Sequence, residues 1–158
     1  MMGGSFRRGR GLWRDKAGSS ALELALLAPL LCALMFGGID LANGFAMKLA
    51  LEQAAGRTAE LATAPGTVSA SYSNLQQEVA SAYGNPYTAI AIDNWLECDN
   101  SRNTSFNGVC PVGQQTARYV SIAISAEYVP YFNYGGIFRG SGAKGGYVAK
   151  GDAVVRVQ

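Results

Sequence analysis

The sequence predicts an α+β protein, with a long N-terminal helix, transmembrane and then amphipathic, followed by a small periplasmic domain with a short helix and an antiparallel sheet. Residues 24–39 carry no charged side chain, which gives 19–39 about the 20 residues that a bilayer-spanning helix needs. Apolar residues then recur at intervals of three and four to about residue 63. After residue 88 the apolar period changes to two, the spacing of β-strands.

The charges are divided unevenly along the chain. The formal net charge is +2, but residues 1–18 hold five basic side chains against one carboxylate, so the leader carries +4 and the remainder −2. A basic segment before an apolar helix stays on the cytoplasmic side. We therefore expect a single-pass inner-membrane protein with a cytoplasmic N-terminus and a periplasmic C-terminal domain. The basic residues serve topology, and we expect no nucleic-acid partner.

One continuous helix is expected from residue 19 to 63, crossing Pro29, which would tilt or kink it. Beyond the membrane, the pattern predicts that Leu41, Phe45 and Leu49 share one apolar face with the later alanines, and that Asp40 lies off it. Ala64-Pro65-Gly66 ends the helix. The expected divisions are a leader (1–18), a transmembrane helix (19–39), its amphipathic continuation (40–63) and an α+β domain (64–158).

A short helix and three strands are expected in the domain. Ser73 and Gln76 form a capping box that starts the helix, and Gly84 with Pro86 stops it. Alternating residues predict strands near 88–93, over 120–128 and over 147–157. The last two should pair antiparallel across the glycine-rich connection 134–146.

Three cysteines are present. Cys32 lies in the apolar run, where a thiol behaves as a small hydrophobe. Cys98 and Cys110 flank a polar loop in the part expected to be exported, and we expect them to form a disulfide in an oxidising compartment. Two reduced, buried thiols are the alternative.

The sequence argues against an enzyme. It contains no histidine, which removes Ser-His and Cys-His nucleophile pairs, HExxH zinc sites and imidazole general bases. Residues 140–145 fit G-x-G-x-x-G, but no helix pattern follows, so we interpret them as a loop. Asp93, Glu97 and Asp99 match no calcium-loop spacing, and we interpret them as solvated charges. We expect no catalytic residue, no cofactor and no metal.

Aromatic residues gather between glycines near the end of the chain. This group could form a contact surface, because aromatics are enriched at interface cores. It could equally cover the sheet as part of the core. The group comprises Tyr128, Tyr131, Phe132, Tyr134 and Phe138.

The start of the helix resembles a type IV prepilin signature. A basic leader ends at Gly18, Ser-Ser-Ala-Leu-Glu follows, and an uncharged run comes next. The resemblance implies that a prepilin peptidase cuts between Gly18 and Ser19, which makes Glu23 the fifth residue of the mature chain. It also implies that Glu23 meets the N-terminal ammonium of a neighbouring subunit, so that two charges costly in lipid neutralise each other. In the alternative, Glu23 is a polar residue at the edge of an ordinary signal anchor.

Residues 17–62 further resemble the TadE-like family of the tight-adherence (Flp) pilus system. The resemblance rests on Glu23 and Pro29, on Phe36-Gly-Gly-Ile-Asp40, and on the alanine-rich residues 51–62. Leu24 and Asp40 depart from the usual residues, Phe or Tyr and Glu, while keeping their character. The resemblance implies a minor pilin or pseudopilin, with a prepilin peptidase, other pilin-type subunits and the inner-membrane assembly machinery as partners.

The expected function is therefore assembly or priming of a tight-adherence pilus, either in the membrane or within the extracellular filament. The alternative is a membrane-anchored binding or adhesion module with an uncleaved anchor, in which the aromatic group contacts a ligand. The N-terminal residue of the mature chain distinguishes the two.

Overall fold

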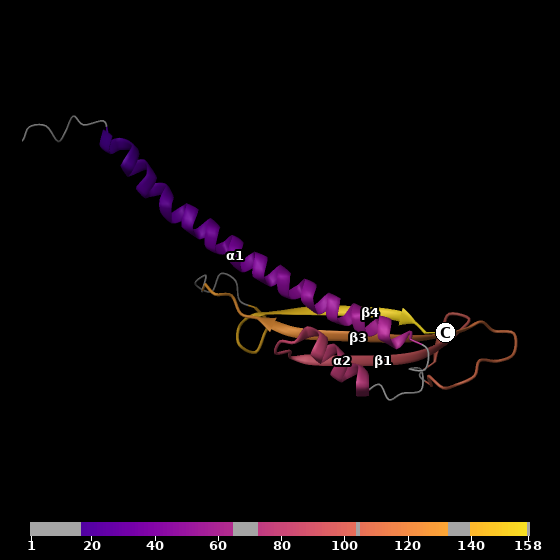
Figure 1. Cartoon of the computed structure of the whole chain (residues 1–158). Coiled ribbons are helices and arrows are strands. Elements are labelled where there is room, and N and C mark those ends of the chain that lie inside the picture. Colours follow the sequence, from indigo (N-terminus) through magenta and orange to yellow (C-terminus); the bar gives the residue numbers. More distant parts are fainter. Residues whose placement is uncertain (1–16, 65–72, 104, 133–139, 158) are drawn as a thin grey trace, which may run out of the picture. The chain divides into compact units, whose positions relative to one another are not determined.

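The computed structural model describes residues 17–64, 73–103, 105–132 and 140–157. It shows an α+β protein, as the sequence predicts, with the element order α1-α2-β1-β2-β3-β4 (Figure 1). The chain divides into two compact units, Met1–Ile39 and Asp40–Gln158. The second half of α1 is part of the second unit, together with α2 and the sheet.

Helix α1 spans Ala17–Ala62 and continues through Pro29. Side chains from residue 20 to residue 39 are almost all exposed. From Asp40 onward one side of α1 becomes buried, beginning with Asp40 itself and continuing at Leu51, Ala54 and Ala55. The character of the helix therefore changes at Asp40.

The second unit has a four-stranded antiparallel sheet in the order β2-β1-β3-β4, with α2 (Ser73–Tyr83) beside β1. The strands are β1 (Ala89–Cys98), β2 (Ser101–Asn103), β3 (Thr116–Tyr128) and β4 (Tyr147–Arg156). The predicted pairing of the last two strands is confirmed, with Tyr128 opposite Tyr147. The strand predicted near 88–93 extends to Cys98, and the short β2 was not predicted.

One face of the sheet carries the core. Val120, Ile122, Ile124 and Ala126 of β3 are buried, and the residues between them are half-exposed. They form one cluster with α1 and with Val79 and Tyr83 of α2. Helices thus cover one face and leave the other to solvent, as is common for antiparallel sheets.

A glycine sets how closely α1 approaches the sheet. A Cβ added at Gly151 of β4 would lie 2.3 Å from the backbone carbonyl carbon of Leu51. Only glycine fits there, so the backbone of α1 rests on β4. Lys48 adds a second link, because its Nζ donates a hydrogen bond to the carbonyl of Lys150 at 3.2 Å.

The expected apolar stripe of α1 is wrong in its first part. Leu41, Phe45 and Leu49 are 63%, 60% and 55% exposed, whereas Asp40 is 5% exposed. The face that rests on Gly151 is the one holding Leu51, and the polar Asp40 shares it. Asp40 can lie inside because the domain supplies its hydrogen-bond donors, which hydropathy alone does not reveal.

Candidate functional site

The residues predicted to serve processing and assembly lie at the start of α1. Gly18 and Ser19 are in its first turn. Glu23 is exposed and four residues after Ser19, a spacing that brings two positions to the same side of a helix. A carboxylate here is available to a group from outside the chain. Residues 1–16 of the leader lie outside the described residues.

Among the described residues, α1 is the one helix long and apolar enough to cross a membrane. Its exposed large apolar side chains from Leu22 to Ile39 cover all sides of the helix, as expected for a segment surrounded by lipid or by other helices. This helix could therefore anchor the protein in a membrane.

Asp40 is the main polar site that the sequence analysis missed. Its carboxylate accepts hydrogen bonds from the Tyr128 hydroxyl at 3.0 Å and from the backbone N–H groups of Tyr131 and Phe132 at 2.9 and 3.3 Å. Gly44, one turn later, lies beside the ring of Tyr128, which a Cβ at Gly44 would meet at 3.7 Å, an ordinary contact distance. Asp40 therefore fixes the segment after β3 to α1.

The same contact changes the acidity of Tyr128. Desolvation by burial, then the hydrogen bond and negative charge of Asp40, raise the pKa of Tyr128 from 10.0 to about 12. An anionic phenolate beside a buried carboxylate is unfavourable, so the hydroxyl stays protonated and keeps donating. A signal in the sequence was available, because Asp40 interrupts an otherwise uncharged run and so needs a partner.

The predicted aromatic group divides between structural and exposed roles. Tyr128 is partly buried and bound to Asp40. Tyr131 is 77% exposed and Phe132 is 37% exposed, although their backbones are held by Asp40. Tyr134 and Phe138 lie outside the described residues. The core interpretation thus fits Tyr128, and the contact-surface interpretation fits Tyr131.

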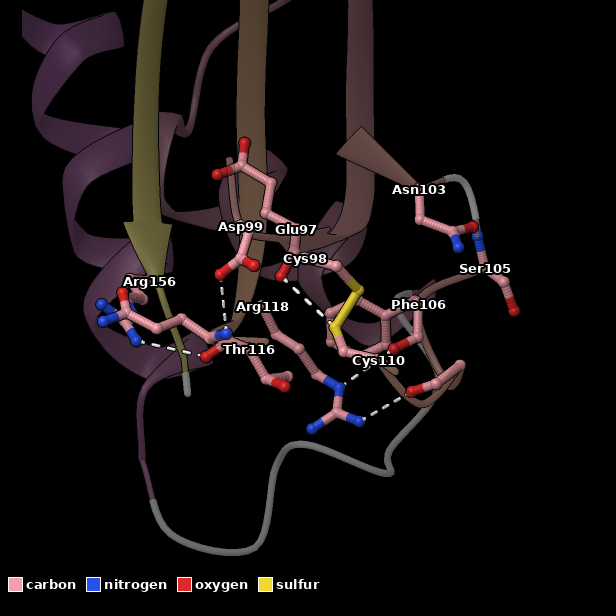
Figure 2. The surroundings of a disulfide bond; sticks show 12 residues. Glu97, Cys98, Asp99, Asn103, Ser105, Phe106, Cys110, Thr116, Arg118 and Arg156 are labelled. Atoms are coloured by element: carbon pink, nitrogen blue, oxygen red, sulfur yellow. Dashed lines mark hydrogen bonds between the residues drawn. A yellow bond between two sulfur atoms is a disulfide. The ribbon is translucent and has the colours of Figure 1, made fainter. Parts of the chain in front are cut away.

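A disulfide joins Cys98 and Cys110, the pair expected from the sequence, with their Cα atoms 5.5 Å apart. It fastens the loop before β3 to the end of β1, as Figure 2 shows. Arg118 adds a polar clamp, because its guanidinium donates to the carbonyls of Phe106 and Gly108. Cys32 is a free, exposed cysteine in α1.

The glycine-rich segment 140–146 is the turn that precedes β4. The backbone N–H groups of Lys144 and Gly146 both donate to Glu127 Oε1 at 2.8 Å. A Cβ at Gly142 would lie within 2.6 Å of three Glu127 side-chain atoms. The amides of this loop are thus aimed at a carboxylate of the chain itself, and a strand follows it where a dinucleotide site needs a helix.

The three carboxylates near the disulfide have separate partners. Asp93 forms an ion pair with Arg102. Glu97 accepts a hydrogen bond from Trp95 Nε1. Asp99 accepts one from the backbone N–H of Gln115. Within the described ranges, no group of three His, Cys, Asp or Glu residues could hold a metal ion.

A second cluster that the sequence analysis missed lies on the face of the sheet away from the helices. Trp95 and Tyr119 sit opposite each other on β1 and β3 and stack with ring centroids 5.4 Å apart. The Arg102 guanidinium lies 4.2 Å from the Trp95 ring centroid. Such cross-strand pairs stabilise a sheet. A sequence signal was available, because extending the predicted strand past Asp93 with the same alternation places Trp95 on the solvent-facing side of the sheet.

The comparisons with known proteins give one match. Residues 18–60 match the family described as TadE-like protein. This result confirms the family resemblance seen in the sequence, over nearly all of α1 and beginning at Gly18. No curated protein and no solved structure matches the chain.

Proposed function

We propose that the protein is a minor pilin or pseudopilin of a tight-adherence pilus system, cut by a prepilin peptidase between Gly18 and Ser19. The observation that carries the proposal is the TadE-like match over residues 18–60, in a helix apolar and long enough to cross a membrane. The family suggests involvement in this pilus system. The basic leader and the exposed Glu23 of this chain fit the same role.

The proposed mechanism uses the new amino terminus. Cleavage leaves an ammonium on Ser19, four residues before Glu23. Within lipid each charge is costly alone, and a neighbouring subunit offers the opposite charge. Lateral packing of α1 against other pilin-type helices brings the two together, and small residues on α1 permit close approach. The protein acts in assembly or priming and is not an enzyme.

The proposed topology has the N-terminus in the cytoplasm and Asp40–Gln158 in the periplasm. The basic leader supports this orientation by its charge. The disulfide between Cys98 and Cys110 supports an oxidising compartment for the domain. The partners proposed are the prepilin peptidase, other pilin-type subunits and the assembly machinery.

The test of processing is the N-terminal residue and intact mass of the protein purified from membranes, with and without a co-expressed prepilin peptidase. We expect a chain that begins at Ser19 only when the peptidase is present. A chain that keeps its leader under both conditions would refute the proposal. It would favour a binding module on an uncleaved anchor, for which the 77% exposure of Tyr131 is the supporting observation.

The assembly role of Glu23 needs a separate test. Glu23→Gln keeps the shape of the side chain and removes its charge, and we expect it to abolish pilus assembly while leaving processing intact. Glu60→Gln is a matched control, since Glu60 is an exposed glutamate on the same helix outside the apolar segment. Unchanged piliation in the Glu23 variant would show that the charge has no assembly role.

A further inference from the structure

We propose that the end of the domain where α1 enters it rests in the headgroup layer of the membrane, held there by exposed aromatic and aliphatic side chains. The inference rests on the part of the proposed function in which residues 20–39 span a bilayer. We call this set the exit collar. It comprises Leu41, Phe45, Val129, Tyr131, Phe132 and Tyr147, all at least 37% exposed.

The position of the exit collar follows from Asp40. Residues 20–39 of a helix rise about 30 Å, which is the thickness of the hydrocarbon core. Asp40 therefore comes at the boundary where hydrocarbon gives way to headgroups. The Tyr131 and Phe132 amides lie within 3.3 Å of the Asp40 carboxylate, so these two aromatics are held at the depth of Asp40. Tyr147 belongs to the same end, because it pairs with Tyr128.

The composition of the exit collar fits this layer. Tyrosine is enriched at membrane–water interfaces, where its ring meets the acyl chains and its hydroxyl meets water. The first exposed charge of α1 after Glu23 is Lys48, eight residues beyond Asp40, or about 12 Å along the helix. Lys48 Nζ pairs with Glu52 at 2.7 Å, so an exposed ion pair first appears at this height, beyond the hydrocarbon. Asp40 is the one charged side chain between Glu23 and Lys48, and the domain buries it.

The binding is also preorganised. Exposed aromatics on a free loop would lose conformational entropy on entering a membrane. Here the carboxylate of a rigid helix already holds the backbone of Tyr131 and Phe132. The buried carboxylate of Asp40 thus orders the backbone of a segment whose side chains remain exposed. The Asp40 contact orders the loop, and the aromatic rings face outward.

The test measures the depth of a spin label in a bilayer. Tyr131→Cys in a Cys32→Ser background is labelled on the full chain, with the Cys98–Cys110 disulfide intact. The protein is placed at one copy per nanodisc of phosphatidylcholine and phosphatidylglycerol. Collisions with oxygen report lipid, and collisions with a water-soluble nickel chelate report solvent. The Asp40 contact survives this substitution, because it uses the backbone N–H of Tyr131.

Two further labels make the result decisive. Leu30→Cys tests whether the helix spans the bilayer. Val154→Cys marks a surface away from the exit collar, since Val154 lies opposite Ser121, seven residues and about 24 Å along β3 from Tyr128. By exposure alone Tyr131 at 77% should meet the nickel chelate more often than Val154 at 59%. We expect the reverse, with collisions reduced several-fold at position 131.

Each outcome is informative. A label at position 131 as accessible to the chelate as that at position 154, with Leu30 in lipid, would overturn the exit collar and leave membrane spanning intact. A label at Leu30 in water would overturn the spanning helix itself. Shielding of position 131 only when several copies share a disc would identify a neighbouring protein as the occupant and also overturn the proposal. Phe45→Cys, a second site in the exit collar, should behave like position 131.

Discussion

Gly151→Ala tests the packing of α1 on the sheet. The added Cβ would lie 2.3, 2.4 and 2.5 Å from the Leu51 carbonyl carbon, the Leu51 oxygen and the Glu52 nitrogen. All three are backbone atoms of a helix, which cannot rotate aside as a side chain can. The helix must therefore lift by about 1 Å to reach ordinary contact, and this displacement sets the energetic cost.

The magnitude follows from the contacts that lifting weakens. A buried leucine makes about 40–60 atomic contacts worth about 0.1–0.2 kcal/mol each, and a gap of about 1 Å loses a quarter to a half of that attraction. Leu51 is fully buried, so at the middle of these ranges it alone loses about 2–4 kcal/mol. Alanine within a strand is more stabilising than glycine by about 0.5–1 kcal/mol, which offsets part of this loss. The expected net loss in the free energy of unfolding is about 1–3.5 kcal/mol.

The assay is urea unfolding of the full chain in detergent micelles, followed by the fluorescence of Trp95 in a Trp13→Phe background. Gly56→Ala is the matched control, because Gly56 lies in the same helix and a Cβ there meets nothing within 4 Å. That variant should be more stable by about 0.5–1 kcal/mol. If Gly151→Ala unfolded at the same urea concentration as the wild type, the close approach of Leu51 to β4 would be wrong.

Four further changes test other contacts of the domain. Asp40→Ala should lower the free energy of unfolding by about 2–4 kcal/mol in a urea titration, because three donors lose a charged acceptor. Asp93→Ala removes a carboxylate from an exposed ion pair and should cost under about 1 kcal/mol. Equal losses in the two variants would refute a special role for the buried Asp40. Tyr128 has a pKa of about 12 in the folded state against 10.0 unfolded. The stability contributed by the Tyr128 hydroxyl is therefore fully present below pH 10 and is lost as the pH rises to 12. Tyr128→Phe should reduce the slope of unfolding free energy against pH between pH 10 and 12. An unchanged slope would show that another group is responsible for it. Glu127→Ala should speed hydrogen exchange several-fold at the Lys144 and Gly146 amides, whereas unchanged exchange would mean that the turn orders itself. Reduction of the Cys98–Cys110 disulfide, separated by 12 residues, should lower unfolding free energy by about 3 kcal/mol, and a protein equally stable with and without reductant would count against a stapling role.

Local patterns predicted the secondary structure well where one physical requirement dominated. The alternation from Val120 to Ala126 predicted β3, because one face of that strand meets the helices and the other meets water. The strand β1 was predicted too short, because Asn94 interrupts the apolar alternation. Pairing with β3 continues to Cys98 regardless, since Trp95 and Leu96 still meet partners on the neighbouring strand.

The sequence by itself determined the length of the α1 helix, its uncharged stretch from residue 24 to residue 39, the family resemblance and the choice of Cys98 and Cys110 as partners. These features depend on periodicity, charge and spacing, which are properties of the chain. Only the tertiary structure decided which side of α1 is buried after Ile39. That choice depends on groups far away in the chain: Gly151 admits the helix backbone, and the segment after β3 supplies donors that make a buried Asp40 favourable. The cost of burying a charge is set by its partners, and the fold brings those partners together.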